Sequence, residues 1–172
     1  MNTETRKSVK ITTYRKEHVN LFITLYRQIF NSPPWNEEWD EFGVEKMILK
    51  SASRKRFLGY TASIGNKAIG FLIAYPLSPF FPFNRIYYLS ELFIHQNIQG
   101  RGIGEKLCLN FFTALSIQNS SGVILLTQKN SPAEKFYMKI GFNSLSSFIK
   151  IQGKIIMYLN LQNNNAKRTY YD

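Results

Sequence analysis

Residues 85–118, RIYYLSELFIHQNIQGRGIGEKLCLNFFTALSIQ, contain the stretch that decides the fold. Strand-forming residues fill 85–94, and three glycines follow within five residues, at Gly100, Gly102 and Gly104. A helix is predicted next, over 102–118, because apolar residues return at helical spacing at Ile103, Leu107, Phe111 and Leu115. A strand, a glycine-rich turn and a helix together favour anion binding, since the first amides of a helix lack intrahelical acceptors.

Two familiar phosphate loops do not match this turn. The dinucleotide-binding pattern needs a glycine three residues after its second glycine, and that position holds Glu105 or Leu107 in the two possible alignments. The P-loop needs Gly-Lys-Ser or Gly-Lys-Thr, whereas this chain has Gly104-Glu105-Lys106. The glycines by themselves therefore predict no more than a tight turn that can hold an anion.

The pattern on both sides of this stretch predicts one α/β domain. Strands are expected at 9–14, 57–64, 67–75, 85–94, 123–127, 142–150 and 154–161, and helices at 17–30, after Asn36, at 102–118 and at 131–140. Gly65-Asn66 suits a hairpin turn. Ser131 with Pro132 suits a helix start, and Gly141 suits a helix end. We expect a mixed, mostly antiparallel sheet in a single domain over residues 1–162, followed by a polar tail at 163–172.

Composition narrows the class of protein. The net charge of +11 favours anionic partners such as a phosphorylated cofactor or nucleic acid, although a solvated basic surface explains it equally well. The basic residues are scattered, which argues against a nucleic-acid-binding protein. Cys108 is the single cysteine, so we expect a reducing, cytoplasmic location. We expect no membrane span, and no Cys/His cluster has the spacing of a metal site.

Two motifs in the expected order resemble those of the GNAT superfamily of N-acetyltransferases. Gln99-x-x-Gly102-x-Gly104 after Leu89-Ser90-Glu91-Leu92-Phe93-Ile94 resembles its motif A. The downstream segments 126–130 and 133–142, LTQKN and AEKFYMKIGF, look like its motif B. The resemblance is tight over residues 87–142 and looser over 9–161. It implies a GNAT-like fold of six to seven strands and about four helices, with the sheet splayed where CoA binds.

The resemblance also implies acetyl-CoA as co-substrate. The family holds the CoA pyrophosphate on the amides of the glycine loop, which here are those of Gln99, Gly100, Arg101, Gly102, Ile103 and Gly104. It lays the pantetheine arm along strand backbone, at the positions of Leu92, Phe93 and Ile94. Asn130 matches an Asn that contacts the cofactor in many members. A capping or turn role for Asn130 is equally open.

Two residues are candidates for proton transfer. Tyr137 resembles the family's general acid, and its phenol has a pKa suited to protonating a thiolate. Tyr137 also fits a half-buried helix tyrosine with a bonded hydroxyl. Glu91 is the candidate base, acting directly or through a water, because a carboxylate in an apolar strand is costly without a role. A solvent-facing Glu91, or one paired with a buried arginine, is the alternative.

The acceptor is expected near the segment that follows the first helix. Five of the 11 acidic residues fall between positions 37 and 45, together with Trp35 and Trp39. Acids beside aromatic rings attract a cationic amine, which makes Trp35, Trp39 and Glu91 candidate substrate-binding residues. Equally, the acids complement a helix dipole and the tryptophans anchor the segment to the core. Phe80, Phe81 and Phe83 suggest an acceptor wall or a subunit contact.

Taken together, the sequence predicts an acetyl-CoA-dependent N-acetyltransferase. The acceptor would be the primary amine of a small molecule or a peptide, and the acetyl group would pass directly through a tetrahedral intermediate. A polyamine, an aminoglycoside and a basic peptide all fit as acceptors, and a longer acyl donor and a homodimer stay open. The alternatives are a non-catalytic acyl-CoA sensor and, with less support, a basic nucleic-acid-binding protein.

Overall fold

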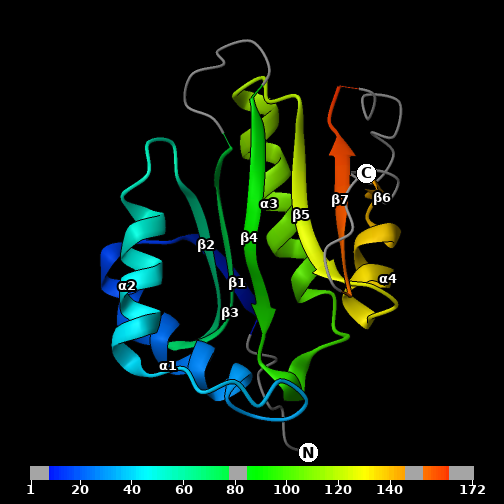
Figure 1. The fold of residues 1–172 in the computed structure, drawn as a ribbon. Coiled ribbons are helices and arrows are strands. Elements are labelled where there is room, and N and C mark those ends of the chain that lie inside the picture. Colours follow the sequence, from blue (N-terminus) through cyan, green and yellow to red (C-terminus); the bar gives the residue numbers. More distant parts are fainter. Residues whose placement is uncertain (1–7, 78–84, 146–152, 163–172) are drawn as a thin grey trace, which may run out of the picture. The chain divides into compact units, whose positions relative to one another are not determined.

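The computed structural model describes residues 8–77, 85–145 and 153–162. Its described strands form one seven-stranded sheet in the order β1-β2-β3-β4-β5-β7-β6 (Figure 1). Chain contacts divide the protein into two compact units, Met1–Ile73 with Glu91–Phe112 and Ala74–Ser90 with Thr113–Asp172. We call them unit 1 and unit 2 and describe each by itself. The mixed α/β class predicted from the sequence is confirmed.

Unit 1 holds the N-terminal part of the sheet and two helices. Its strands are β1 (Val9–Thr13), β2 (Leu58–Ile64) and most of β3 (Lys67–Pro76), with the end of β4 (Ile86–Ile94). Its helical elements are η1 (Lys16–His18), α1 (Val19–Phe30), α2 (Glu41–Ala52), η2 (Gln96–Ile98) and the first part of α3 (Ile103–Ile117). β1 and β2 are antiparallel, with a register from Val9↔Ile64 to Thr13↔Tyr60.

Aromatic side chains dominate the core of unit 1. Helix α1 buries one face, as its spacing predicts, and Phe22 has no exposed surface. The Phe22 ring lies 5.2 Å from that of Phe71 on β3 and 5.2 Å from that of Phe93 on β4, centroid to centroid. Both pairs are close to edge-to-face, the arrangement that aromatic quadrupoles favour. This packing fixes α1 against the end of β4, where the sequence places Glu91.

Unit 2 is built around β5 (Gly122–Gln128) and β7 (Lys154–Asn160), which pair antiparallel along their whole length and run side by side in Figure 1. β6 (Asn143–Ser144) adds to β7, and α4 (Pro132–Lys139) follows β5. β4 and β5 are parallel, and their register covers three residues of each strand, from Ile86↔Gly122 to Tyr88↔Ile124. The predicted start and stop of α4 are confirmed, because Ser131 caps it and Gly141 has a φ of +98°.

One predicted helix start is wrong. Asn36 does not cap the second helix but lies in a turn with a φ of +48°. Asp40 is the cap instead, and its side chain accepts a hydrogen bond from the Gly43 amide at 2.7 Å. Helix α2 therefore begins at Glu41, and Glu37 and Glu38 belong to the loop before it rather than to its first turn. Asn and Asp cap equally well, so the residues alone could not separate the two positions.

Some predictions fall outside the described residues. Phe80, Phe81 and Phe83 lie in 78–84, and the polar tail lies in 163–172, so their structural roles stay predictions. The single-domain organisation over 1–162 also stays a prediction. In the described part of the chain, no helix is long and apolar enough to cross a membrane.

Candidate functional site

The glycine loop of unit 1 leaves its backbone open to a ligand. Gly100 and Gly102 have φ values of +74° and +75°, a region that side chains with a Cβ rarely adopt. No atom lies within 4 Å of the position where a Cβ would stand at either glycine. The two glycines therefore allow the positive φ values of this turn, and they leave the space beside the backbone empty.

The amides of this loop have no acceptor of their own. Within the described residues, the N–H groups of Gly100, Arg101, Gly102, Ile103 and Gly104 take part in no hydrogen bond. The first backbone bond that closes α3 runs from the Lys106 amide to the Gly102 carbonyl, at 3.1 Å. Several unbonded N–H groups at a helix N-terminus form a cradle for an anion. Arg101 is exposed beside them and adds a full positive charge.

Gln99 connects this loop to the end of β4. Its side-chain Nε2 donates to the Ile94 carbonyl at 2.9 Å. This hydrogen bond links the start of the glycine loop to the last residue of β4. The turn between them is a short 3-10 helix in which the His95 ring accepts from the Asn97 amide at 3.3 Å. Gln99 therefore has a structural role, holding the cradle at a fixed distance from the strand end.

The end of β4 lies close against β3. A Cβ added to Gly70 would stand 2.4 Å from Ile94 Cδ1 and 2.9 Å from the Phe93 carbonyl oxygen. The His95 amide donates to the Ile69 carbonyl at 2.8 Å and so continues the pairing past the strand end. Phe93 and Ile94 are buried and Leu92 is half-buried. One backbone edge of the end of β4 therefore lies against β3.

Glu91 lies at the edge of the aromatic core of unit 1. It stands two residues before Phe93, and strand alternation puts both side chains on one face of β4. Phe93 packs on Tyr26 of α1, with ring centroids 5.4 Å apart. Burial in this half-buried position raises the pKa of Glu91 to about 8, and the negative charge of Glu37 adds to the effect. No buried arginine pairs with it: within the described residues its carboxyl group has no hydrogen bond or ion pair.

Tyr26 faces the same two carboxyl groups. Its ring is buried, and burial, Glu91 and Glu37 all raise the pKa of its hydroxyl. Tyr26 packs edge-on against Trp39, with ring centroids 5.6 Å apart. The structure thus brings Glu91, Tyr26, Glu37 and Trp39 together from β4, α1 and the loop after α1.

The tryptophans of this loop differ in their surroundings. Trp39 is half-buried against the core, so the anchoring role predicted for the tryptophans applies to it. Trp35 is 48% exposed and touches only the ring of Phe30, at 5.8 Å, among the described aromatic pairs. Of the acids, Asp40 caps α2 and Glu41 lies 3.8 Å from Arg27, so both have local roles.

Asn130 and Tyr137 lie in unit 2, around the start of α4. Asn130 has a φ of +59°, and its amide donates to the Glu134 carboxylate, while the Glu134 amide donates to the hydroxyl of Ser131, the cap of α4. The turn role predicted as an alternative is therefore present, and the Asn130 side chain is exposed. Tyr137 is the buried residue of α4, and its ring packs on Phe136 and Phe142 at 5.3 and 5.5 Å.

Other chemically active residues have structural roles. Burial and Glu105 raise the pKa of the Cys108 thiol, which suits a core residue better than a nucleophile. The His18 Nδ1 contacts the Arg15 amide and the Thr61 hydroxyl, both at 3.1 Å. Across the three described ranges, no three His, Cys, Asp or Glu side chains gather as a metal site would require. Two hollows of about 350 and 540 Å³ in unit 1 contain none of the predicted site residues.

Sequence reasoning missed the roles of Glu37 and Tyr26. The sequence places Glu37 among the acids of its segment without a role of its own, and Tyr26 lies within the predicted helix 17–30 without a signal for a site. A carboxyl two residues from an indole was the available signal, because the Trp39 Nε1 donates to the Glu37 carboxylate. The electrostatic interaction of each residue with Glu91 spans more than fifty residues of sequence and leaves no local signal.

Comparisons with known proteins show the family and the fold of the chain. The model of the acetyltransferase (GNAT) family matches residues 19–142, which include α1, the glycine loop and α4. No curated protein sequence matches the chain.

Many solved structures share the fold, and three illustrate it. The PaiA N-acetyltransferase from Thermoplasma acidophilum, in complex with coenzyme A, has a TM-score of 0.70 at 17% identity, covering 89% of this chain and 99% of that one. The ribosomal-protein-S18-alanine N-acetyltransferase from Escherichia coli has a TM-score of 0.68 at 17% identity, covering 90% and 94%. An acetyltransferase from Streptococcus agalactiae has a TM-score of 0.71 at 14% identity, covering 88% and 98%. At such identities the likeness extends to the fold alone.

Proposed function

Because the chain belongs to the GNAT family of acetyltransferases, we propose that it transfers an acetyl group from acetyl-CoA to the primary amine of a small molecule or peptide. The observation that carries the proposal is the cradle of five unbonded amides between Gly100 and Gly104. A pyrophosphate accepts several hydrogen bonds and carries negative charge, so it fits this cradle. Arg101 adds a salt-sensitive attraction.

The cofactor would extend from this cradle along β4. Leu92, Phe93 and Ile94 would bind the pantetheine arm through their backbone, in the manner of an added strand. Their buried or half-buried side chains are consistent with backbone recognition. Asn130 is proposed as a further contact, because its side chain is exposed while its backbone amide is bonded to the Glu134 carboxylate.

Glu91 is the proposed base. An alkyl ammonium has a pKa of about 10, so a carboxylate of ordinary pKa takes its proton poorly. Each unit of pKa difference costs ~1.4 kcal/mol, and the pKa of Glu91, raised to about 8, removes most of that cost. The free amine then attacks the acetyl carbon, and the Ile94 amide is the proposed donor to the oxyanion.

Tyr137 is the proposed acid. The attack forms the N–C bond of the tetrahedral intermediate. Its collapse re-forms the carbonyl double bond and breaks the C–S bond, so that the nitrogen gives up a second proton and a CoA thiolate leaves. The Tyr137 hydroxyl would protonate this thiolate, while Glu91 holds the proton from the amine. The burial of Tyr137 in α4 would hold the ring in a single orientation.

An amine panel tests this function. Acetyl-CoA is mixed with small amines and peptides, and thiol release and acetylated product are measured together. We expect equal amounts of both. We also expect Tyr137→Phe to lower kcat by about a hundredfold or more, since a hundredfold is the lower end of the usual effect of an acid–base group. CoA binding without acetylation of any amine, with no change in Tyr137→Phe, would instead indicate the acyl-CoA sensor.

A further inference from the structure

Glu37 is held in one place although its side chain is exposed. Its amide donates to the Phe30 carbonyl at 2.8 Å, and its carboxylate accepts from the Trp39 indole. The Trp39 backbone is fixed in turn by Asn31, which accepts from its amide at 3.0 Å and donates to its carbonyl at 2.8 Å. Arg27 Nε donates to the same carbonyl at 3.2 Å. The loop thus presents the Glu37 carboxylate at a defined position against α1.

Glu37 and Glu91 are two carboxyl groups that interact with each other and have no described cation beside them. The chain has 22 Lys and Arg residues, and Glu41 in the same segment does pair with Arg27. Yet in the described part of the chain neither Glu37 nor Glu91 forms an ion pair. Burial is the main cause that raises the pKa of Glu91, and the negative charge of Glu37 raises it further. Two carboxyl groups that interact electrostatically and that no described cation neutralises are a place where an incoming cation lowers the free energy.

Aromatic rings line the same place. Tyr26 interacts with both carboxyl groups, and Trp39 packs against Tyr26 while bonding Glu37. Ring faces attract ammonium groups and pack against methylene chains. The surroundings of the pair therefore suit a chain of methylenes that carries more than one ammonium.

We propose that Glu37 selects the acceptor, and that the acceptor is a small diamine or polyamine whose reacting amine lies at Glu91 and whose second ammonium is held by Glu37. This inference rests on the proposed acetyltransferase function. It adds a specificity-determining residue and restricts the acceptor to molecules with at least two amino groups. An acceptor with a carboxylate at the second position is repelled by the same residue.

Three acceptors of equal chain length test the charge requirement. They are 1,4-diaminobutane, butylamine and 4-aminobutanoate, which place a cation, no charge and an anion at the far end. Values of kcat/KM are measured with acetyl-CoA at one pH and one ionic strength. We expect the diamine to be the best acceptor, butylamine to be weaker and 4-aminobutanoate to be the weakest.

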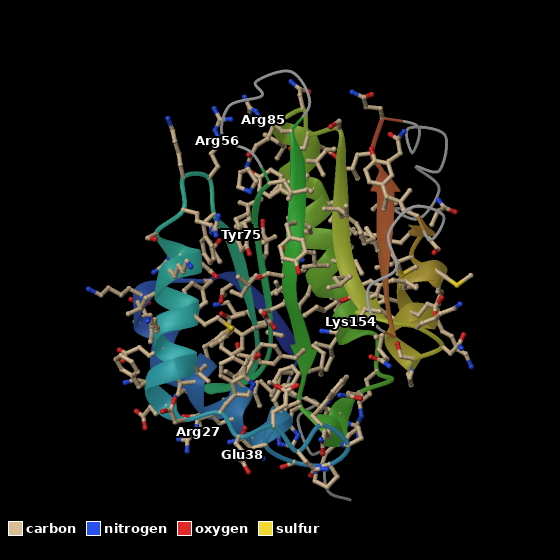
Figure 2. All side chains as sticks on the ribbon, viewed as in Figure 1. Arg27, Glu38, Arg56, Tyr75, Arg85 and Lys154 are labelled. Carbon is tan, nitrogen blue, oxygen red and sulfur yellow. The ribbon has the colours of Figure 1, made fainter. Side chains whose placement is uncertain are left out.

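Variants at two adjacent residues then distinguish a specific effect of Glu37 from the effect of removing any negative charge in this loop. Glu37→Gln keeps an oxygen that can accept from the Trp39 indole but removes the charge. We expect it to lower the preference for the diamine over butylamine about tenfold, the effect of losing one hydrogen-bonded charge. Glu38→Gln is the matched control, because Glu38, labelled in Figure 2, is exposed in the same loop and no described residue bonds it. This control keeps the wild-type preference.

The pH dependence of kcat/KM is a further test, because it would not change if Glu37 had only a structural role. Burial and, to a lesser degree, Glu37 raise the pKa of Glu91, and among the described residues Tyr26 is a further titratable group that interacts electrostatically with Glu91. In the pH profile of kcat/KM for butylamine, activity rises as Glu91 loses its proton. Glu37→Gln should therefore move this rising limb to lower pH, and Glu38→Gln should leave it in place. Equal turnover of the diamine and butylamine, or equal preferences in the two variants, would show the inference to be wrong. Failure to acetylate any amine would instead refute the proposed function.

Discussion

Glu91 shows how surroundings change the chemistry of one residue. The sequence identified it as a carboxyl group in an apolar strand, which predicted a special environment. The structure adds the causes, which are burial beside Tyr26 and the negative charge of Glu37, a residue far away in the sequence. The same two causes make Glu91 a better proton acceptor and a less stable anion, so its effect on folding can be measured without any substrate.

Replacing Glu91 by Gln tests this environment through stability. The folded-state pKa of about 8 lies above the value of 4.5 for an exposed Glu, so the protonated form is favoured in the folded protein. The contribution of Glu91 to stability is therefore complete below pH 4.5 and is lost as the pH rises toward 8. Since Gln cannot ionise, we expect Glu91→Gln to gain stability relative to wild type across this window, by at most ~1.4 kcal/mol per pH unit.

Urea unfolding followed by circular dichroism between pH 5 and 9 measures this difference. Above pH 8 the difference should become constant, because Glu91 is then ionised in both states. Glu45→Gln is a suitable control, since Glu45 is exposed on α2. A stability difference that stays flat between pH 5 and 8 would mean that Glu91 is solvated like an ordinary surface acid.

Elements were predicted best where their signals are local. The hairpin at Gly65, the cap of α4 at Ser131 and the helix after the glycine loop all follow from a few adjacent residues, and the structure has each of them. The start of α2 was misplaced by four residues, because Asn36 and Asp40 are equally good caps. Packing decided between them, since Asn31 and Arg27 bind the Trp39 backbone and keep the chain out of the helix until Asp40.

The candidate site was predicted in part for the same reason. The glycine loop is a local motif, so its residues could be assigned from their spacing. The role of Gln99 could not, because its bond to the Ile94 carbonyl depends on how the turn between them folds. The pairing of Glu37 with Glu91 depends on packing between α1 and β4, which no local pattern encodes.

The glycine loop can be tested as an element, separately from catalysis. Gly102→Asp strains a residue with a φ of +75° and places a negative charge among the unbonded amides. We expect CoA affinity to fall at least a hundredfold, about 2.7 kcal/mol, because both repulsion and lost backbone bonds act on the pyrophosphate. Gly104→Asp should act in the same direction. Isothermal titration calorimetry with CoA measures the effect.

Gly65 supplies a control for backbone strain. It has a φ of +58°, no atom stands near its Cβ position, and it lies in the β2–β3 turn. Gly65→Asp therefore introduces the same side chain into a similarly strained and open position without touching the glycine loop. It should bind CoA as tightly as wild type. If Gly65→Asp and Gly102→Asp lose affinity equally, the loss comes from general destabilisation and the loop is not the phosphate site.

At the scale of the whole molecule, charge is distributed unevenly in a way that matches two kinds of ligand. The net charge is +11, yet five of the 11 acids lie between positions 37 and 45. A basic protein attracts an anionic cofactor over a long range, whereas a local group of carboxylates attracts an amine. A nucleic-acid-binding protein would have the first property without need of the second. An acetyltransferase should therefore be stabilised by acetyl-CoA, and a nucleic-acid-binding protein by nucleic acid.

Thermal unfolding with different anions decides between them. A ligand at a hundred times its Kd stabilises the folded state by about 2.7 kcal/mol. For a chain of 172 residues this corresponds to a rise in Tm of roughly 5–10 °C. We expect acetyl-CoA to produce such a rise in the wild type and none in Gly102→Asp, while a duplex oligonucleotide at equal phosphate concentration produces little. The opposite order, with a rise that disappears at high salt, would favour nucleic acid as the ligand, because counterion release makes that binding strongly salt-dependent.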